Sequence, residues 1–508
     1  MTAAETPIRG RRRAPILILV IVALGAGLAA GQAAEPERAK VVNQIDAVQS
    51  ANPRAISTAW YCPGVPDSFP AADQTITLSN LGSTDSDAVI TVHPDSGDDA
   101  IIRTVSVPKA SLRTFSRATL ADVSVAGGQA NGGEANGAKA PKSLPPGAVV
   151  VEPFSPDVVV SAGVESNNAL AVVPCGTEAS ADWYFAAGTT VRGVSQWLVL
   201  DDPFSSDARV DITLRTDSGL QQLPSLQGVD VPGRSRVVIP IQDSAVRQER
   251  VAVEVHAGVG RVVASQTLVF SSAAGQPGVA TTLGALEPSS SWWFADGKTL
   301  SGAIQYVAVT DLGVIDAHVV VQALIGSKGI VQPAELTVAA GQVNWVQIGG
   351  CERNAKDCLA VPKNTGYELT VQSGTVPVIA QTLSRFTDSD AALGAVTVMG
   401  SIKPARRWVI ARTRAIDQRS TSIALLNTGV IPAHVSVQVV HDGVVDRPPS
   451  LQALTIRAGA RAVLPSGLNG VTRPVDTAVV ITSDVPILAE STIYAQRDAT
   501  RVSGIPTR

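Results

Sequence analysis

An aromatic cluster recurs at near-constant spacing along this chain of 508 residues. The clusters are Trp60-Tyr61-Cys62, Trp183-Tyr184-Phe185, Trp292-Trp293-Phe294 and Trp408-Val409-Ile410. The steps between their leading tryptophans are 123, 109 and 116 residues. Spacing of this kind indicates an array of similar units rather than one large domain.

Two further landmarks recur in step with the tryptophans. An Asn or Asp follows each tryptophan by 19 or 20 residues, at Asn80, Asp202, Asp311 and Asn427. A short apolar motif recurs near the unit end, at 262–264, 378–380 and 487–489, with a weaker match at 159–161. We therefore predict four repeats, which span residues 57–180, 181–289, 290–404 and 405–508.

Repeat two shows what one unit contains. Its segment 209–215 alternates polar and apolar residues with a period of two, which is typical of a strand with one solvated face. Short apolar runs between turn residues predict further strands at 197–200, 229–233, 236–241, 251–255, 262–268 and 279–283, with 251–255 and 262–268 forming a hairpin.

Seven or so strands in a unit of about 110 residues predict an all-β fold with one antiparallel β-sandwich of immunoglobulin-like size in each repeat. A β-propeller is the alternative, although a blade needs only four strands and about 45 residues.

The N-terminus predicts export. Residues 1–13 form a basic tail with four arginines, and residues 14–34 are uncharged. Basic residues stay cytoplasmic, and about 20 apolar residues span a bilayer, so 14–34 is a signal anchor or a signal peptide. Residues 35–56 would be a tether, and the rest would be extracytoplasmic. Cleavage at the small residues of 31–33, which would secrete the protein, is the alternative.

Cysteine usage agrees with an oxidising compartment, because the four cysteines can form two disulfides. Cys62 lies in the first strand of repeat one and Cys175 near its last strand, so a Cys62–Cys175 bridge would close the unit. Cys351 and Cys358 flank a charged loop and predict a second, local bridge. Zinc binding is the rival interpretation, but CxxC pairs and a neighbouring histidine are missing.

Charge and composition narrow the partners. The whole chain has a formal charge of −4, and residues 1–34 carry +3, so the remainder carries −7. Nucleic acid and anionic lipid require a concentrated basic face, which this balance argues against. Segment 126–146 is rich in Gly and Asn with few apolar residues, and it predicts a mobile insertion in repeat one.

The aromatic clusters allow two interpretations. Residues i and i+2 of a strand share a face, so Trp183 and Phe185 point one way and Tyr184 the other, and Trp293 likewise opposes its neighbours. We expect one face to anchor the repeat core and the other to cover the junction with the preceding repeat. The alternative is that Tyr184 and Trp293 stack on sugar rings of a ligand.

The recurring Asn and Asp residues invite a calcium or catalytic interpretation. Because each follows a strand, turn chemistry, in which the side chain bonds its own backbone, explains them better. His318 and His434 are equivalent, but repeat two has Arg209 there, so exposed strand residues are expected rather than a metal site. Segment 95–99 resembles part of a calcium loop without its later glutamate, and it predicts a solvated hairpin tip.

Motifs of hydrolases, phosphate loops and dinucleotide sites are missing from the sequence. We therefore predict that the protein is not an enzyme and has no cofactor.

The N-terminal anchor, the aromatic clusters and the final strands with Ala-Gln or Ala-Glu resemble an actinobacterial exported family of unknown function. The best-matching segments are 60–63, 183–185 and 292–294. The resemblance implies a cell-envelope setting and brings no catalytic residues. The predicted function is a non-catalytic envelope scaffold or partner-binding rod, with binding of wall polysaccharide by exposed aromatics as the alternative.

Overall fold

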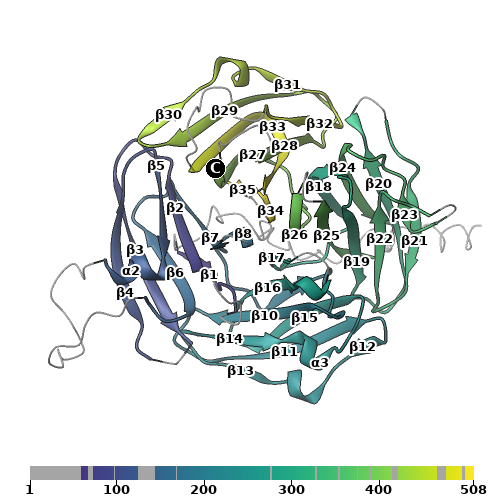
Figure 1. Ribbon diagram of the computed structural model, residues 1–508, viewed down its shortest axis with the longest axis horizontal. Coiled ribbons are helices and arrows are strands. Elements are labelled where there is room, and N and C mark those ends of the chain that lie inside the picture. Colours follow the sequence, from purple (N-terminus) through teal and green to yellow (C-terminus); the bar gives the residue numbers. More distant parts are fainter. Residues whose placement is uncertain are drawn as a thin grey trace, which may run out of the picture. The chain divides into compact units, whose positions relative to one another are not determined.

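β-Strands, nearly all paired antiparallel, make up most of the regular structure (Figure 1). The computed structural model describes residues 59–66, 73–95, 98–123, 143–166, 169–274, 277–326, 329–352, 355–374, 376–388, 392–414, 421–465, 476–494 and 498–507. The predicted tail, membrane segment and tether, and most of the predicted insertion at 126–146, lie outside these ranges. Within them, no helix has the length and apolar character needed to cross a membrane.

The strands divide among the repeats as the landmarks predict. Repeat one contains β1 (Trp60–Cys62), β2 (Asp73–Asn80), β3 (Ser86–Pro94), β4 (Ile101–Val107), β5 (Ser111–Ser116), β6 (Gly147–Pro153), β7 (Val158–Ser166) and β8 (Ala169–Pro174). Repeat two contains β9 (Asp182–Phe185), β10 (Val194–Asp202), β11 (Ala208–Thr216), β12 (Gly219–Gln221), β13 (Val229–Val231), β14 (Ser235–Pro240), β15 (Val251–Val259), β16 (Val263–Phe270) and β17 (Gly278–Leu283).

Repeat three contains β18 (Ser291–Lys298), β19 (Ile304–Asp311), β20 (Ala317–Leu324), β21 (Ala334–Val338), β22 (Val343–Ile348), β23 (Cys358–Leu359), β24 (Gly366–Ser373), β25 (Val378–Asp388) and β26 (Ala392–Met399). Repeat four contains β27 (Ala405–Arg414), β28 (Thr421–Asn427), β29 (Ala433–His441), β30 (Val444–Asp446), β31 (Leu454–Ile456), β32 (Ala460–Val463), β33 (Asp476–Tyr494), β34 (Ala499–Ser503) and β35 (Ile505–Pro506). The short helices are α2 (Arg117–Ala121), α3 (Ile241–Ser244), η1 (Pro224–Leu226), η2 (Ser272–Ala274) and η4 (Pro449–Leu451).

Each of the first three repeats has two sheets, whereas a propeller blade would have one. In repeat two, strands β12-β11-β15-β9 form one sheet and β14-β10-β16-β17 the other. The predicted hairpin of 251–255 with 262–268 is therefore wrong, because β15 and β16 belong to different sheets. β16 pairs instead with β17, so the chain crosses between the sheets after β15. In repeat four the 19-residue strand β33 pairs with strands on both sides of the unit and joins its ladders.

One hydrogen bond explains why two of the sequence landmarks recur together. The indole N–H of Trp183 donates to the carbonyl of Val262 over 2.7 Å, at the start of the apolar motif near the unit end. Repeats three and four repeat the bond, from Trp292 to Val378 over 2.8 Å and from Trp408 to Ile487 over 2.7 Å. A buried indole needs an acceptor, so the tryptophan and the motif belong to one structural unit.

The final strands of the four repeats meet one another. β8 contacts both β17 and β34, and β26 also contacts both of them, so the first repeat touches the last. Figure 1 shows these four strands, each with a different repeat's colour, toward the middle of the described region. A rod of successive units is therefore wrong for this chain, because in a rod β8 and β34 would lie at opposite ends.

The carboxylate of Asp498, just before β34, accepts one backbone N–H from the final strand of every repeat. Its Oδ2 bonds Leu170 at 2.9 Å and Val279 at 3.1 Å, and its Oδ1 bonds Ala395 at 3.2 Å and Ala499 at 2.9 Å. At the equivalent positions, immediately before these residues, the other repeats have Ala169, Gly278 and Gly394. A Cβ at Gly394 would collide with the Asp498 carboxylate, so the small residue there makes room for the charged one.

Candidate functional site

Both predicted disulfides are present. The Cα atoms of Cys62 and Cys175 lie 4.7 Å apart although 113 residues separate them. Two backbone hydrogen bonds between Tyr61 and Gly176 confirm that the two ends of repeat one are neighbours. Because all four cysteines are in disulfides, none of them is a zinc ligand.

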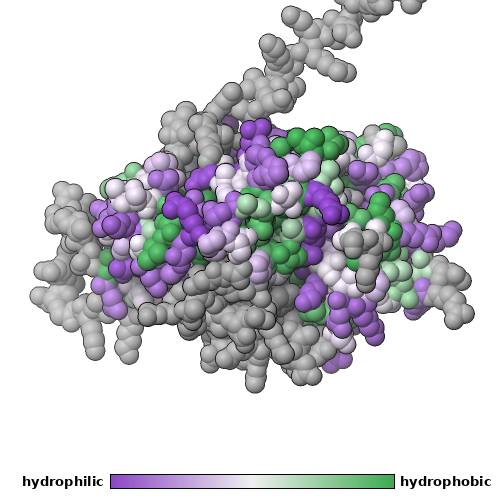
Figure 2. All heavy atoms as spheres, turned by 90° about the horizontal axis from the view of Figure 1, so that it is seen from above, coloured by the Kyte–Doolittle hydropathy of each residue, from purple (hydrophilic) through white to green (hydrophobic). Residues whose placement is uncertain are grey.

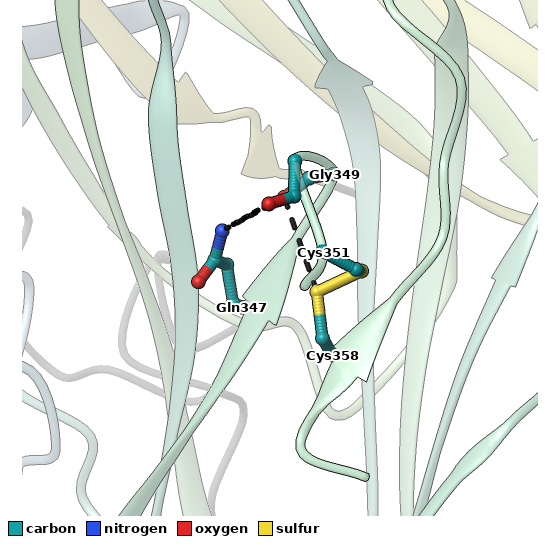
Figure 3. Close-up of a disulfide and its surroundings, with 5 residues drawn as sticks. Gln347, Gly349, Cys351 and Cys358 are labelled. Atoms are coloured by element: carbon teal, nitrogen blue, oxygen red, sulfur yellow. Dashed lines mark hydrogen bonds between the residues drawn. A yellow bond between two sulfur atoms is a disulfide. The ribbon is translucent and has the colours of Figure 1, made fainter. Parts of the chain in front are cut away.

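The second disulfide, between Cys351 and Cys358, closes the loop from β22 to β23 (Figure 3). The side-chain amide of Gln347 donates a hydrogen bond to the Gly349 carbonyl at 3.0 Å. The Sγ atom of Cys358 lies 3.9 Å from the same oxygen. A disulfide sulfur has no hydrogen to donate, so the second contact is one of packing.

The recurring Asn and Asp residues are turn residues, as predicted. In each repeat the side-chain oxygen accepts the backbone N–H two residues on, as Gly82 donates to Asn80 at 2.9 Å. The same bond forms at Asp202, Asp311 and Asn427. His318 and His434 are exposed on their strands, where their rings lie near threonine hydroxyls, which confirms the prediction for them.

Trp183 and Phe185 are buried, as are Trp292 and Phe294 two positions apart in repeat three. Trp293 on the opposite face of β18 is only half-buried, and its ring packs on the apolar cluster of repeat four. The predicted junction with the preceding repeat is therefore wrong, because Trp293 covers the junction with the following one. Closure of the repeats around their final strands places the sheet of β18 against the next unit.

A pocket of about 160 Å³ lies at this junction and has Trp293 in its wall. Repeat three supplies Gln322 and Leu324 from β20, Ile330 after it, and Glu368 and Thr370 from β24. Repeat four supplies the end of β28, the turn after it and a glycine; these residues are Leu426, Asn427, Thr428 and Gly459. The register of β18, β24 and β20 aligns Trp293 with Thr370 and Thr370 with Gln322, so the three side chains form one row across the sheet.

Glu368 is the charged group of the pocket and is 2% exposed. Neither of its carboxylate oxygens has a hydrogen-bond partner in the described part of the chain. Burial raises the pKa of Glu368 to about 7, and the positive charge of Arg461 opposes that shift. Arg461 itself is engaged elsewhere, because its guanidinium bonds the Asp296 carboxylate at 2.8 Å and the Ala295 carbonyl at 2.6 Å.

Tyr184 occupies the same position as Trp293 but has different surroundings. Its strand neighbour Glu254 forms an ion pair of 2.7 Å with Arg215, so charged side chains already adjoin the ring. Burial, with the negative charges of Asp182 and Glu254, raises the pKa of Tyr184 to about 12. The structure thus places the two predicted stacking residues in unlike sites, and only Trp293 lines the pocket described above.

Sequence reasoning missed Glu368 and Asp498. Glu368 sits in an alternating strand, where a polar residue predicts a solvent-facing side chain. Asp498 carried a weak signal, since aligning the repeat ends pairs it with Gly278 and Gly394. The predicted hairpin tip at 95–99 has one role that was not foreseen, because Asp95 forms an ion pair with the buried Arg236 of repeat two.

Comparisons with known proteins identify a family but no activity. Residues 119–353 match the model of a family of unknown function, DUF5719. The expected resemblance to a family of unknown function is thereby confirmed for this part of the chain. No curated protein matches the sequence.

Two solved structures are similar to part of the chain. A protein of Thermotoga maritima, numbered 1070, shares 18% identity over 22% of this chain and 94% of its own, with a TM-score of 0.20. The sensory rhodopsin transducer of Anabaena shares 25% identity over 19% of this chain and 83% of its own, with a TM-score of 0.16.

Proposed function

We propose that this chain is a non-catalytic scaffold or partner-binding protein of the cell envelope, with its repeats outside the cytoplasm and the two sheets of each repeat forming an immunoglobulin-like sandwich. The two disulfides support an extracytoplasmic location, because disulfides persist in oxidising compartments. Shared apolar clusters support the sandwich, since residues of both sheets of repeat three enter one core.

The observation that favours partner binding is a pair of bare apolar residues at equivalent turns of repeats three and four. Val314 is 94% exposed and Val430 is 93% exposed, and each is followed by an exposed isoleucine, Ile315 or Ile431. Both turns are held by an Asx bond to the preceding landmark residue. Adjacent exposed apolar residues on ordered turns mark interaction surfaces more often than isolated ones do.

We call these four residues the apolar turns, and they separate from the rest of the surface. On the face drawn in Figure 2, hydrophobic residues stand among hydrophilic ones. The corresponding turn of repeat one is polar, with Gly82, Ser83 and Thr84. The apolar pair is thus a property of two repeats and not a requirement of the turn.

Cross-linking in native membranes tests this proposal. The variant with serine at all four positions of the apolar turns should keep its melting temperature, because these side chains contribute little to the core. It should lose a defined cross-linked envelope protein that the unchanged chain recovers. Serine at the exposed Phe154 and Val259 is the control and should leave that product in place. Recovery of the same product by the turn variant, or binding of the unchanged chain to protein-free liposomes through these turns, would overturn the proposal.

Binding of wall polysaccharide is the second candidate, and Trp293 favours it because its ring is half-exposed in a pocket. The size of the pocket suits one head group more than a run of sugar rings, since sites for larger ligands have roughly 300–1,000 Å³. Loss of peptidoglycan or arabinogalactan binding in Trp293→Ala, with retention in Tyr184→Ala, is the result this candidate requires.

A further inference from the structure

We propose that the pocket between repeats three and four binds an organic cation, an alkylammonium or guanidinium head group, between the ring of Trp293 and the carboxylate of Glu368. This site uses side chains other than the apolar turns, so it does not depend on the proposed partner surface. The argument rests on the unpaired carboxylate, on the aromatic wall and on comparison with the three equivalent junctions.

The unpaired carboxylate demands a partner. Glu368 is almost fully buried, and its oxygens have no hydrogen bond within the described residues. Burying a charge without a partner is strongly unfavourable, and an opposite charge removes much of that penalty. The nearest cation, Arg461, is held by Asp296 and the Ala295 carbonyl. A cation entering the pocket would complete the site.

The junction between repeats two and three shows what the fold places at the same position. Strand register makes Tyr184 equivalent to Trp293, because each pairs with the corresponding residue of the next strand, Glu254 or Thr370. In the same way Arg215 is equivalent to Leu324, since they pair with Ala252 and Glu368.

In that junction the chain therefore supplies its own cation. The guanidinium of Arg215 lies 2.7 Å from Glu254 and is close enough to Tyr184 to lower its pKa, and Arg215 is 5% exposed. In the junction between repeats three and four, Leu324 replaces the arginine, while a carboxylate remains one strand pair along on the same face. A guanidinium or ammonium from outside would take the role that Arg215 has in the other junction.

The other two junctions lack the carboxylate. Between repeats four and one, the equivalent residues are apolar and join one core with repeat one; they are Val409, Val440, Ala478 and Val480. Between repeats one and two, the residues that correspond to Leu324 and Glu368 are His93 and Ala148. Within the described residues, an unpaired carboxylate thus occurs at this position in one junction of the four.

The chemistry of the lining favours an organic cation over a metal ion. Calcium takes six to eight oxygen ligands and zinc takes four donors, whereas this pocket offers one carboxylate beside an indole. The face of an indole attracts ammonium and guanidinium groups, and apolar residues such as Leu426 and Ile330 suit a short alkyl stem. The volume of about 160 Å³ fits a head group with a few methylene groups.

The test uses the exported part of the chain, residues 35–508, with n-butylammonium and n-butylguanidinium as probes and 1-butanol as the neutral probe of similar shape. Calorimetry should detect binding of both cations, and 1-butanol should bind at least about tenfold more weakly. Affinity for the cations should fall as the pH drops below about 7, because Glu368 then takes up a proton. Equal affinity for 1-butanol, or no binding of either cation, would overturn the proposal.

Three variants locate the site. Glu368→Gln keeps the shape and should weaken cation binding at least about tenfold, and Trp293→Leu should weaken it about threefold or more. Leu324→Arg places in the pocket the guanidinium that the other junction already has, so it should abolish cation binding and raise the melting temperature. Glu254→Gln removes the carboxylate of that other junction and should leave binding unchanged. Cation binding that survives in Leu324→Arg and Glu368→Gln would place the site elsewhere and refute the assignment.

Discussion

The carboxylate of Asp498 accepts a hydrogen bond from the backbone N–H of Leu170 over 2.9 Å, although the two residues are 328 positions apart. The bond joins the last repeat to the first. Three further N–H groups on the same carboxylate extend the junction to every repeat. One substitution in an otherwise repeated position, an Asp where the others have Gly or Ala, thus gives the four units a common centre.

Asp498→Asn should lower the free energy of unfolding by at least about 2 kcal/mol. The amide keeps one acceptor oxygen, but its NH2 group would face two N–H donors, which would stay buried and unpaired. Urea unfolding followed by circular dichroism measures the change. Asp484→Asn is the control, because Asp484 accepts the N–H of His434 at an exposed site, and its effect should be about 1 kcal/mol or less. Equal stability of Asp498→Asn and the unchanged chain would contradict the role assigned to the carboxylate.

The two disulfides should contribute unequally to stability. Loop closure over 113 residues predicts about 5 kcal/mol for Cys62–Cys175, and closure over 7 residues predicts about 2 kcal/mol for Cys351–Cys358. Paired Cys→Ala variants, compared by urea unfolding without reductant, measure both contributions. A larger loss on removal of Cys351–Cys358 would show that the first bridge is not the closure of repeat one that its position indicates.

Arg236→Met should destabilise the junction of repeats one and two. The guanidinium is buried, bonds both oxygens of Asp95 at 2.5 and 2.8 Å, and donates to the Pro63 and Val65 carbonyls. Removing one partner of a buried ion pair costs about 3–5 kcal/mol. The matched control is Arg209→Met, which breaks the exposed pair with Asp230 and should cost about 1 kcal/mol or less. Calorimetric melting of the two variants decides between these values.

Stability should fall as the pH rises from 5 to 8. Burial raises the pKa of Asp201 to about 8 and the pKa values of Asp498 and Glu490 to about 7. The folded state therefore retains protons that the unfolded state releases near pH 4, so its advantage is complete below that pH and is lost as the pH passes 7 to 8. Burial lowers the pKa of His93, which acts in the opposite direction near pH 6.5.

Urea unfolding at pH 5, 6.5 and 8 measures this dependence, and unfolding at pH 6 should release protons into a weak buffer. Asp201→Asn should flatten the decrease, because it removes the group with the highest of the raised pKa values. A stability that rises steadily from pH 5 to 8 would mean that these carboxylates are ionised in the folded protein.

The sequence by itself determined the features that are local or strictly repeated. The spacing of Trp183, Trp292 and Trp408 located the repeats, and period-two alternation located most strands of repeat two. The Asx turns followed from residue type, since Asn and Asp bond their own backbone wherever a turn needs it. The Cys62–Cys175 pairing followed from the order of strands within one unit.

Tertiary structure alone decided how the repeats meet, and with it the candidate site. Strand alternation shows that Trp293 and Glu368 each face away from their buried neighbours, but it does not show what lies opposite. Contacts between distant strands settle that question, because closure around Asp498 places repeat four over the outer face of repeat three. A position that reads as solvent-facing in one repeat thereby becomes the wall of a pocket between two.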